Sequence, residues 1–369
     1  MTKNSSLLLL FVLFLSLLLP FSIDHASAQD IQWNDWNGMQ WSLDGSTLLI
    51  KGDPSNETDT TYPWVEHKYL VESVIIEEGT TKIGNSYFQD FLILSDISIP
   101  NTVTVIGNQA FYNCKSLSNI QLPNNLSEFG DYAFYSSGLN EIAVPGSVTS
   151  FGNWAFSSCS NLKKATLLSG VTSIGYAAFN LCKNLTNITI PDSVTYIDDY
   201  AFSNCESLSS IKIPDEVKYI GERVFQGCIK LLNISIPYGV KEIKESTFQG
   251  CSRLSSVNIP NSVTTIADGN GGDGVFVGCE SLTDIKIPES VTYIGGYAFN
   301  GSGLTNITIP ESVISLGDSY PFAFSNCNEL KSVKILGGID SIKENSFSGC
   351  YNLTNVELLD GVKVILGKR

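Results

Sequence analysis

Nine cysteines are the residues in this 369-residue chain most suited to chemistry, because thiols can form disulfides or bind zinc. Each stands three residues after a phenylalanine. The nine are Cys114, Cys159, Cys182, Cys205, Cys228, Cys251, Cys279, Cys327 and Cys350. In a helical turn, a spacing of three brings two side chains to one side, so the pattern predicts that cysteine and phenylalanine face a common core.

Neither a zinc site nor a disulfide framework fits these cysteines well. Zinc requires ligands that converge on one point, whereas these thiols follow each other in a line with no C-x-x-C pair, and the only histidines are His25 and His67. Bridges between adjacent turns are sterically possible. The odd number of cysteines, with Cys114 lacking a cysteine in either neighbouring turn, favours mostly free thiols that act as small hydrophobes. The other turns fill the position with Phe91, Ser137 or Ser302.

Catalytic motifs are missing from the sequence. It contains no glycine-rich phosphate loop after a strand and no G-x-S-x-G, and His67 would be the one histidine base of the exported chain. The adjacent pair Asp198 and Asp199 has nothing that would separate the two pKa values. We therefore expect a protein that is not an enzyme and needs no cofactor. A glycan-active enzyme with its site in the N-terminal segment is a minor alternative.

An insertion rich in glycine and aspartate, DGNGGDG at residues 268–274, could suggest calcium. It occurs once, Gly272 stands where an EF-hand ligand belongs, and Cys279 takes the place of the glutamate at the twelfth loop position. A flexible loop is the better interpretation, so we do not expect calcium as a partner. A second, smaller insertion lies around Ser319, Tyr320 and Pro321.

The charge balance excludes some classes of partner. The formal net charge is −15, and only 16% of the residues are charged. Nucleic-acid binding needs clustered lysine and arginine, so we do not expect it. The acidity also disfavours adsorption to anionic lipid.

The N-terminus predicts export. Lys3 precedes an apolar run of thirteen residues, 7–19, and Ala26-Ser-Ala28 resembles a signal-peptidase site. Residues 1–28 are thus the predicted signal peptide, with cleavage after Ala28 and no membrane insertion afterwards. An uncleaved anchor is the alternative. The location expected is secreted or at the cell surface.

Residues 29–70 do not repeat and hold four of the five tryptophans, Trp33, Trp36, Trp41 and Trp64. Asp44-Gly45 between two alternating runs predicts a hairpin. A solenoid needs a dissimilar end segment to close its core, so we interpret these residues as an N-terminal cap. A tryptophan-lined carbohydrate site is the rival interpretation.

Residues 71–369 repeat with a period of mostly 23, giving about 12–13 turns. The block Cys182–Asn204 is typical: an alternating run with Leu185, Ile188 and Ile190 ends on proline, and a second short run and an Ala-Phe turn follow. The pattern predicts an α/β repeat solenoid with a continuous parallel sheet on its concave face, second short strands, and short helical or 3-10 turns. The repeated phenylalanines are Phe88, Phe111, Phe134, Phe156, Phe179, Phe202, Phe225, Phe248, Phe276, Phe299, Phe324 and Phe347.

Units such as SLSSIKIPDEVKYIGERVFQGC resemble the BspA-type leucine-rich repeats of secreted and surface proteins, and WSLDGSTLLIKG resembles the leader of that family. The resemblance covers residues 36–369. It implies a curved solenoid that binds other macromolecules, in some relatives as an adhesin, and it implies no catalytic residues.

Aromatic residues recur at two solvent-facing repeat positions, which makes them candidate contacts for a partner. The alternative is that they pack flat on neighbouring turns and shield the backbone. The position before the second inward isoleucine carries Tyr196, Tyr219 and Tyr293. The position two before the phenylalanine carries Tyr132, Trp154, Tyr200 and Tyr297. Outward strand positions, which could equally be a solvated sheet face, carry Asn187, Asn233 and Asn306.

We therefore expect an extracellular or cell-surface binding protein that recognises a protein or glycan through its solenoid surface, like an adhesin or receptor. A passive structural protein of an envelope or matrix is the alternative. The last repeat has no dedicated cap, so its strand edge is expected to be exposed, blunted by Lys363, Lys368 and Arg369, or covered by a partner.

Overall fold

The computed structural model describes residues 31–55, 61–267, 273–317, 320–339, 341–359 and 364–365. The chain divides into two units, Met1–Trp33 and Asn34–Arg369, and the second contains the described strands. The predicted signal peptide, residues 1–28, lies outside the described residues. Among the residues that are described, no helix has the length and apolar character needed to cross a bilayer.

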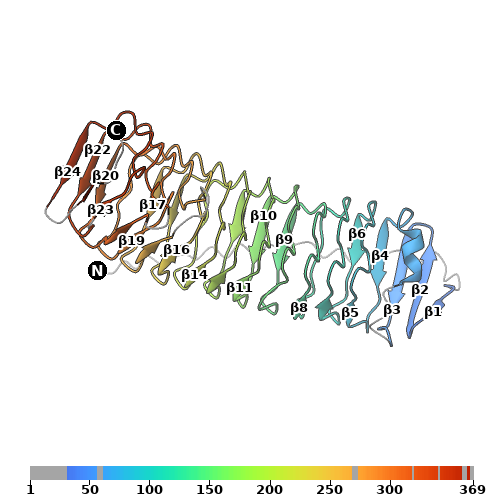
Figure 1. Ribbon diagram of the computed structural model, residues 1–369. Helices are drawn as coiled ribbons and strands as arrows, with labels where there is room; N and C mark the ends of the chain where they lie inside the picture. Colours follow the sequence, from blue (N-terminus) through green and yellow to red (C-terminus); the bar gives the residue numbers. More distant parts are fainter. Residues whose placement is uncertain are drawn as a thin grey trace, which may run out of the picture. The chain divides into compact units, whose positions relative to one another are not determined.

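Each repeat forms one coil of a β-solenoid, and the coils of the unit Asn34–Arg369 stack in a row (Figure 1). Most coils contain a strand of three or four residues, a second strand of two residues, and a turn around the repeated phenylalanine. The first strands are β4 (Ser73–Ile76), β6 (Asp96–Ser98), β9 (Glu141–Val144), β10 (Lys164–Leu167), β12 (Asn187–Thr189), β15 (Asn233–Ser235), β17 (Ser256–Asn258), β20 (Asn306–Ile309), β22 (Ser332–Ile335) and β24 (Asn355–Leu358). The second strands are β5 (Lys82–Ile83), β7 (Val105–Ile106), β8 (Glu128–Phe129), β11 (Ser173–Ile174), β13 (Tyr196–Ile197), β14 (Tyr219–Ile220), β16 (Glu242–Ile243), β18 (Thr265–Ile266), β19 (Tyr293–Ile294), β21 (Ser315–Leu316), β23 (Ser341–Ile342) and β25 (Val364–Ile365).

Strand alternation builds the core. In β12, Ile188 is buried while Asn187 and Thr189 are exposed, because successive side chains of a strand point to opposite faces. Neighbouring strands pair in parallel with equal repeat positions opposite each other, as Ala165 does with Ile188. The inward residues of all coils therefore form continuous columns and one shared core. A slip of one residue would turn the polar positions inward.

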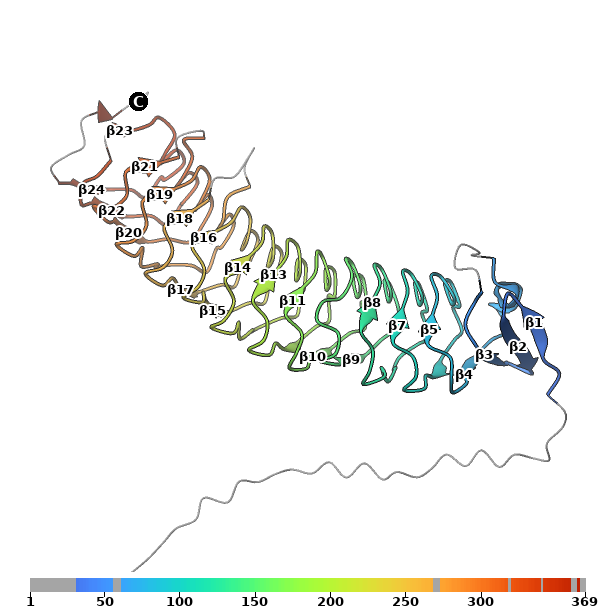
Figure 2. The ribbon, with the colours of Figure 1, turned by 90° about the horizontal axis from the view of Figure 1, so that it is seen from below.

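The sequence predicts one continuous sheet of first strands, and this prediction is wrong. They pair in four groups, β4 with β6, β9 to β12, β15 with β17, and β20 to β24. Residues 119–122, 210–213 and 284–287 carry the same alternation without being strands. Figure 2 shows the second strands along the inner side of the bend of this unit and the first strands along the outer side, the reverse of the predicted concave placement. Alternation determines which residues face inward within a coil, whereas the bend depends on small differences in spacing between coils.

The predicted helical turns are wrong, and the term α/β fits poorly. Helix is limited, within the described ranges, to the 3-10 segment η1 (Pro63–His67). The phenylalanine turns instead contain left-handed residues two before and two after the ring, such as Tyr132 at φ 56° and Ser136 at φ 61°. These backbone angles cannot belong to a right-handed helix. The three-residue spacing from phenylalanine to cysteine reflects a hydrogen-bonded turn, in which the Cys205 N–H donates to the Phe202 carbonyl at 3.2 Å.

The twelve repeated phenylalanines stack in one ladder through the core. Successive ring centroids lie 4.9–5.8 Å apart, and the rings are nearly parallel. The spacing persists across the first insertion, where Phe248 and Phe276 are 5.5 Å apart. The inserted residues therefore leave the stacking of the coils unchanged.

At the N-terminal end, strands β1 (Asn34–Trp36), β2 (Met39–Asp44) and β3 (Thr47–Lys51) are antiparallel, and β3 then pairs in parallel with β4. The hairpin predicted at Asp44-Gly45 is confirmed. Trp64 is fully buried and donates its indole N–H to the Tyr87 carbonyl at 3.1 Å. Trp36 and Trp41 are partly buried against the same core.

Candidate interaction surface

Six half-buried aromatic side chains follow one another along the phenylalanine turns, and we call them the aromatic ridge. Their rings contact each other at centroid distances of 5.0–6.0 Å, within one coil for Tyr132 and Tyr135 and between neighbouring coils for the other contacts. Tyr132 and Trp154 are stacked with an interplanar angle of 2°. The ridge consists of Tyr112, Tyr135, Tyr132, Trp154, Tyr176 and Tyr200.

Backbone hydrogen bonds between coils hold the ridge in place. The N–H groups of Tyr132, Phe134 and Ser136 each donate to the next coil at 2.8 Å. This ladder secures the left-handed conformation of Tyr132, Trp154 and Tyr200, at φ 56–59°, which is unusual for bulky residues. The ring positions are therefore set by the backbone of two coils at once.

A second pair, Tyr196 and Tyr219, lies on the paired strands β13 and β14. The rings stack at 4.4 Å with an interplanar angle of 2°. Partial burial, followed by the nearby Asp198 carboxylate, raises the pKa of Tyr196, and its hydroxyl donates to Asp198 Oδ1 at 3.4 Å. The Lys244 ammonium lies over the other face of the pair, 5.4 Å from the Tyr219 ring centroid.

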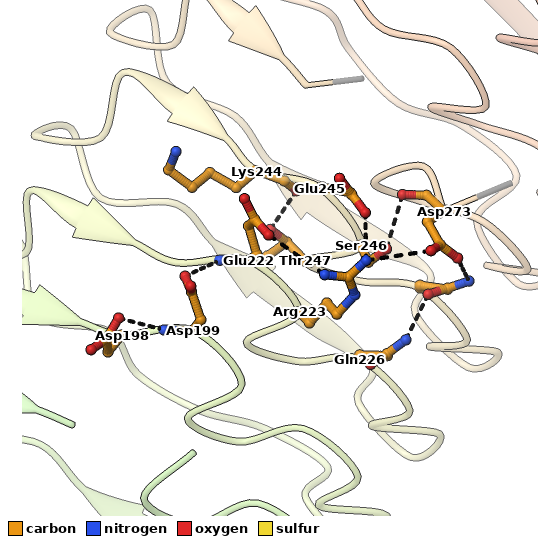
Figure 3. A network of polar contacts seen from close by, with 11 residues as sticks. Asp198, Asp199, Glu222, Arg223, Gln226, Lys244, Glu245, Ser246, Thr247 and Asp273 are labelled. Carbon is orange, nitrogen blue, oxygen red and sulfur yellow. Dashed lines mark hydrogen bonds and ion pairs between the residues drawn. The ribbon is translucent and has the colours of Figure 1, made fainter. Parts of the chain in front are cut away.

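Arg223 ends the aromatic ridge and begins a polar network (Figure 3). Its guanidinium lies 5.6 Å from the Tyr200 ring centroid and forms ion pairs with three carboxylates. These belong to Glu245 at 2.5 Å, Asp273 at 3.3 Å and Glu222 at 3.5 Å. Partial burial raises the pKa of Glu245 although the Arg223 charge opposes the shift.

The structure brings together five of the ten predicted contact residues. Tyr132, Trp154 and Tyr200 lie in the ridge, and Tyr196 and Tyr219 form the stacked pair. Tyr297 lies elsewhere, stacked on Phe322 at 4.8 Å, and Tyr293 pairs with Thr265 and Ser315 on neighbouring strands. The three asparagines do not gather, since they are exposed on strands of three separate sheets. They are Asn187 on β12, Asn233 on β15 and Asn306 on β20.

Sequence reasoning missed four residues of this surface. Tyr112 and Tyr135 are 23 residues apart, so the repeat period could have identified them. Tyr176 stands one residue before the aromatic repeat position and enters the ridge because the tilted ring contacts Trp154 and Tyr200. Arg223 occupies the same repeat position as Tyr200. The sequence pattern predicted contact residues at this position only where the residue is aromatic.

The cysteines form a structural row in the core. All nine are free, and all except the half-buried Cys350 are buried. Each thiol lies within hydrogen-bond distance of the phenylalanine carbonyl of the preceding coil, as Cys205 does to Phe179 at 3.3 Å. Burial raises the pKa of Cys228 to about 12, which keeps the thiol protonated at neutral pH.

No group of three histidine, cysteine or acidic side chains suited to a metal occurs in the part of the chain that the structure describes. Of the first insertion, 268–272 lie outside that part, and Asp273 is paired with Arg223. The expectation about calcium therefore stays a prediction.

A family model described as the BspA type leucine rich repeat region (6 copies) matches residues 81–184, 172–270 and 271–368. The structure is similar to a leucine-rich repeat protein from Bacteroides ovatus, with 26% identity, a TM-score of 0.55, and coverage of 89% of this chain and 98% of that one. The pneumococcal vaccine antigen PcpA shares the fold at 20% identity, with a TM-score of 0.54 and coverage of 92% and 88%. A comparison with curated proteins found no match. The chain belongs to the BspA-type leucine-rich-repeat family.

Proposed function

We propose that this chain is a secreted or cell-surface protein that binds another macromolecule, a protein or a glycan, through the aromatic ridge. The continuous contact of the six rings is the observation that carries the proposal. Tyrosine and tryptophan supply apolar area together with a polar edge, and they are enriched among residues that dominate binding energy. Rings already held by their neighbours lose little side-chain entropy when a partner binds.

Two features of the N-terminal part agree with this role. The predicted signal peptide, cleaved after Ala28, would export the chain. Trp36, Trp41 and Trp64 pack on the N-terminal end of the core, so we infer that residues 29–70 act as its cap. With Trp64 fully buried, a carbohydrate site that needs its ring face is disfavoured.

The test is binding of the labelled chain, without residues 1–28, to a glycan array and to an array of extracellular proteins. A Tyr132→Ala/Trp154→Ala variant should lose about 30-fold in affinity, because truncating central contacts costs about 2 kcal/mol. Tyr238→Ala is the matched control, since this tyrosine is 69% exposed and lies outside the ridge. Circular dichroism would verify that all three chains are folded. Unchanged affinity of the ridge variant would refute the proposed surface.

A passive structural role is the second candidate, and one observation favours it. The ridge rings use their faces on one another, as in the Tyr132–Trp154 stack at 6.0 Å, which also suits shielding of the backbone. In that case neither array would give a ligand, and the ridge variant would only lose stability.

A further inference from the structure

Cys327 and Cys350 form a row of two in adjacent coils. Ser302 takes the cysteine position in the preceding coil, and its hydroxyl lies 3.4 Å from Cys327 Sγ. The two coils are in register on both sides of the cysteines, since Phe324 stacks on Phe347 at 5.4 Å and Ser332 pairs with Asn355. Paired strands are about 4.8 Å apart, a separation that lies within the Cα range of disulfides.

The two thiols lie at equivalent positions of adjacent coils. Cys327 Sγ is 3.1 Å from the Phe299 oxygen, and Cys350 Sγ is 3.1 Å from the Phe324 oxygen, which also accepts the Cys327 N–H at 3.4 Å. The neighbouring Cys350 thiol lowers the pKa of Cys327 against the opposing effect of burial, and the Cys327 thiol, together with burial, raises the pKa of Cys350. Because the two coils are in register, the Cys350 thiol occupies the position that follows the Cys327 thiol along the solenoid.

This pair is also more accessible than the other cysteines. Cys350 is half-buried, as are Phe347 and Leu353 in the same coil, whereas their counterparts in inner coils are fully buried. Among the described residues, β24 pairs with β22 on one side only. Elements with fewer packed neighbours open most readily, so a reagent can reach Cys350 without unfolding the solenoid.

We propose that Cys327 and Cys350 are a dithiol site that a low-molecular-weight disulfide, such as oxidised glutathione, converts to a disulfide. The Cys350 thiolate attacks one glutathione sulfur, which forms a mixed disulfide and releases the first reduced glutathione. The Cys327 thiolate then attacks Cys350 Sγ and releases the second. The protein loses two protons and two electrons, and the glutathione disulfide gains both. The bond links the last two phenylalanine turns.

The test uses the folded chain without residues 1–28, incubated with oxidised glutathione, alkylated under denaturing conditions and analysed by peptide mass mapping. Seven thiols should be alkylated and one bridge should join Cys327 to Cys350. Hydrogen exchange in β24 should slow on oxidation. Cys350→Ser should keep the fold, because serine stands at the equivalent Ser137 and Ser302, and should leave all eight remaining thiols free. Cys114→Ser, an isolated buried cysteine, is the control that should retain the bridge.

Three results would overturn the proposal. All nine thiols could remain free after oxidation, the bridge could join an interior pair such as Cys182 and Cys205, or glutathione could persist as a mixed disulfide on Cys350. Each result would show that oxidised glutathione does not join these two thiols in the folded chain.

Discussion

Replacing Gly130 by alanine should force two coils apart. Gly130 stands four residues before Phe134, where the chain crosses the preceding coil. A β-carbon there would lie 2.4 Å from the Asn108 nitrogen and 2.4 Å from the Gly107 carbonyl carbon, both backbone atoms that cannot move independently. Ordinary contact begins at 3.4 Å, so the coils would need to separate by about 1 Å.

The cost can be derived from the hydrogen bonds between these coils. Gly130 N–H donates to Ile106 at 2.8 Å, Asp131 N–H to the Asn108 side chain at 2.8 Å, and Gln109 N–H to Asp131 at 2.9 Å. At about 1 kcal/mol each, their loss amounts to about 3 kcal/mol. Alanine also lowers the conformational entropy of the unfolded chain, which stabilises the folded state by about 0.5 kcal/mol. The Gly130→Ala variant should therefore lose roughly 2–3 kcal/mol of unfolding free energy.

Urea denaturation measures the loss, and hydrogen exchange locates it. Because a coil contacts only its neighbours, exchange should rise around Phe134 and stay unchanged around Phe299. Lys244→Ala is the matched control, since Lys244 occupies the same repeat position and already has a β-carbon. It should cost less than about 1 kcal/mol, from a surface ion pair with Glu242 and the contact with Tyr219. If the urea midpoint of Gly130→Ala equals that of the wild type, the close approach of the coils is refuted.

Two further predictions concern the core and the tyrosine pair. Phe202→Ala should lose about 3–5 kcal/mol in urea denaturation, because the ring is fully buried between Phe179 and Phe225 at 5.7 and 5.8 Å; a loss below about 1 kcal/mol would contradict the ladder. The raised pKa of Tyr196 means that the folded chain holds the phenolic proton more tightly than the unfolded chain. Its contribution to stability is complete below about pH 10 and is lost as the pH rises through the folded pKa. In a tyrosinate absorbance titration, Tyr196→Phe should remove a late transition, and a wild-type curve confined to the region of pH 10 would count against it.

The core could be predicted from the sequence because its chemistry repeats. The sequence places Ile188 and Phe202 in the core, because apolar residues that recur at the same position of every coil must all face away from water. The same holds for burial of Cys205, although its neighbour is the carbonyl of the preceding coil rather than a helical face. Part of the surface could also be predicted from the sequence, because a repeat period of 23 residues places Tyr196 beside Tyr219.

The features that only the tertiary structure reveals arise from contacts between neighbouring coils. The left-handed turn at Tyr132, the breaks at residues 119–122 and 284–287, and the bend of the solenoid depend on how one coil rests on the next. Tyr176 and Arg223 joined the candidate surface for the same reason, through ring and charge contacts across coils. A repeat pattern specifies the inside of each coil, because apolar residues must leave water. The spacing and rotation between coils come from the sum of many small contacts, and no single residue type encodes them.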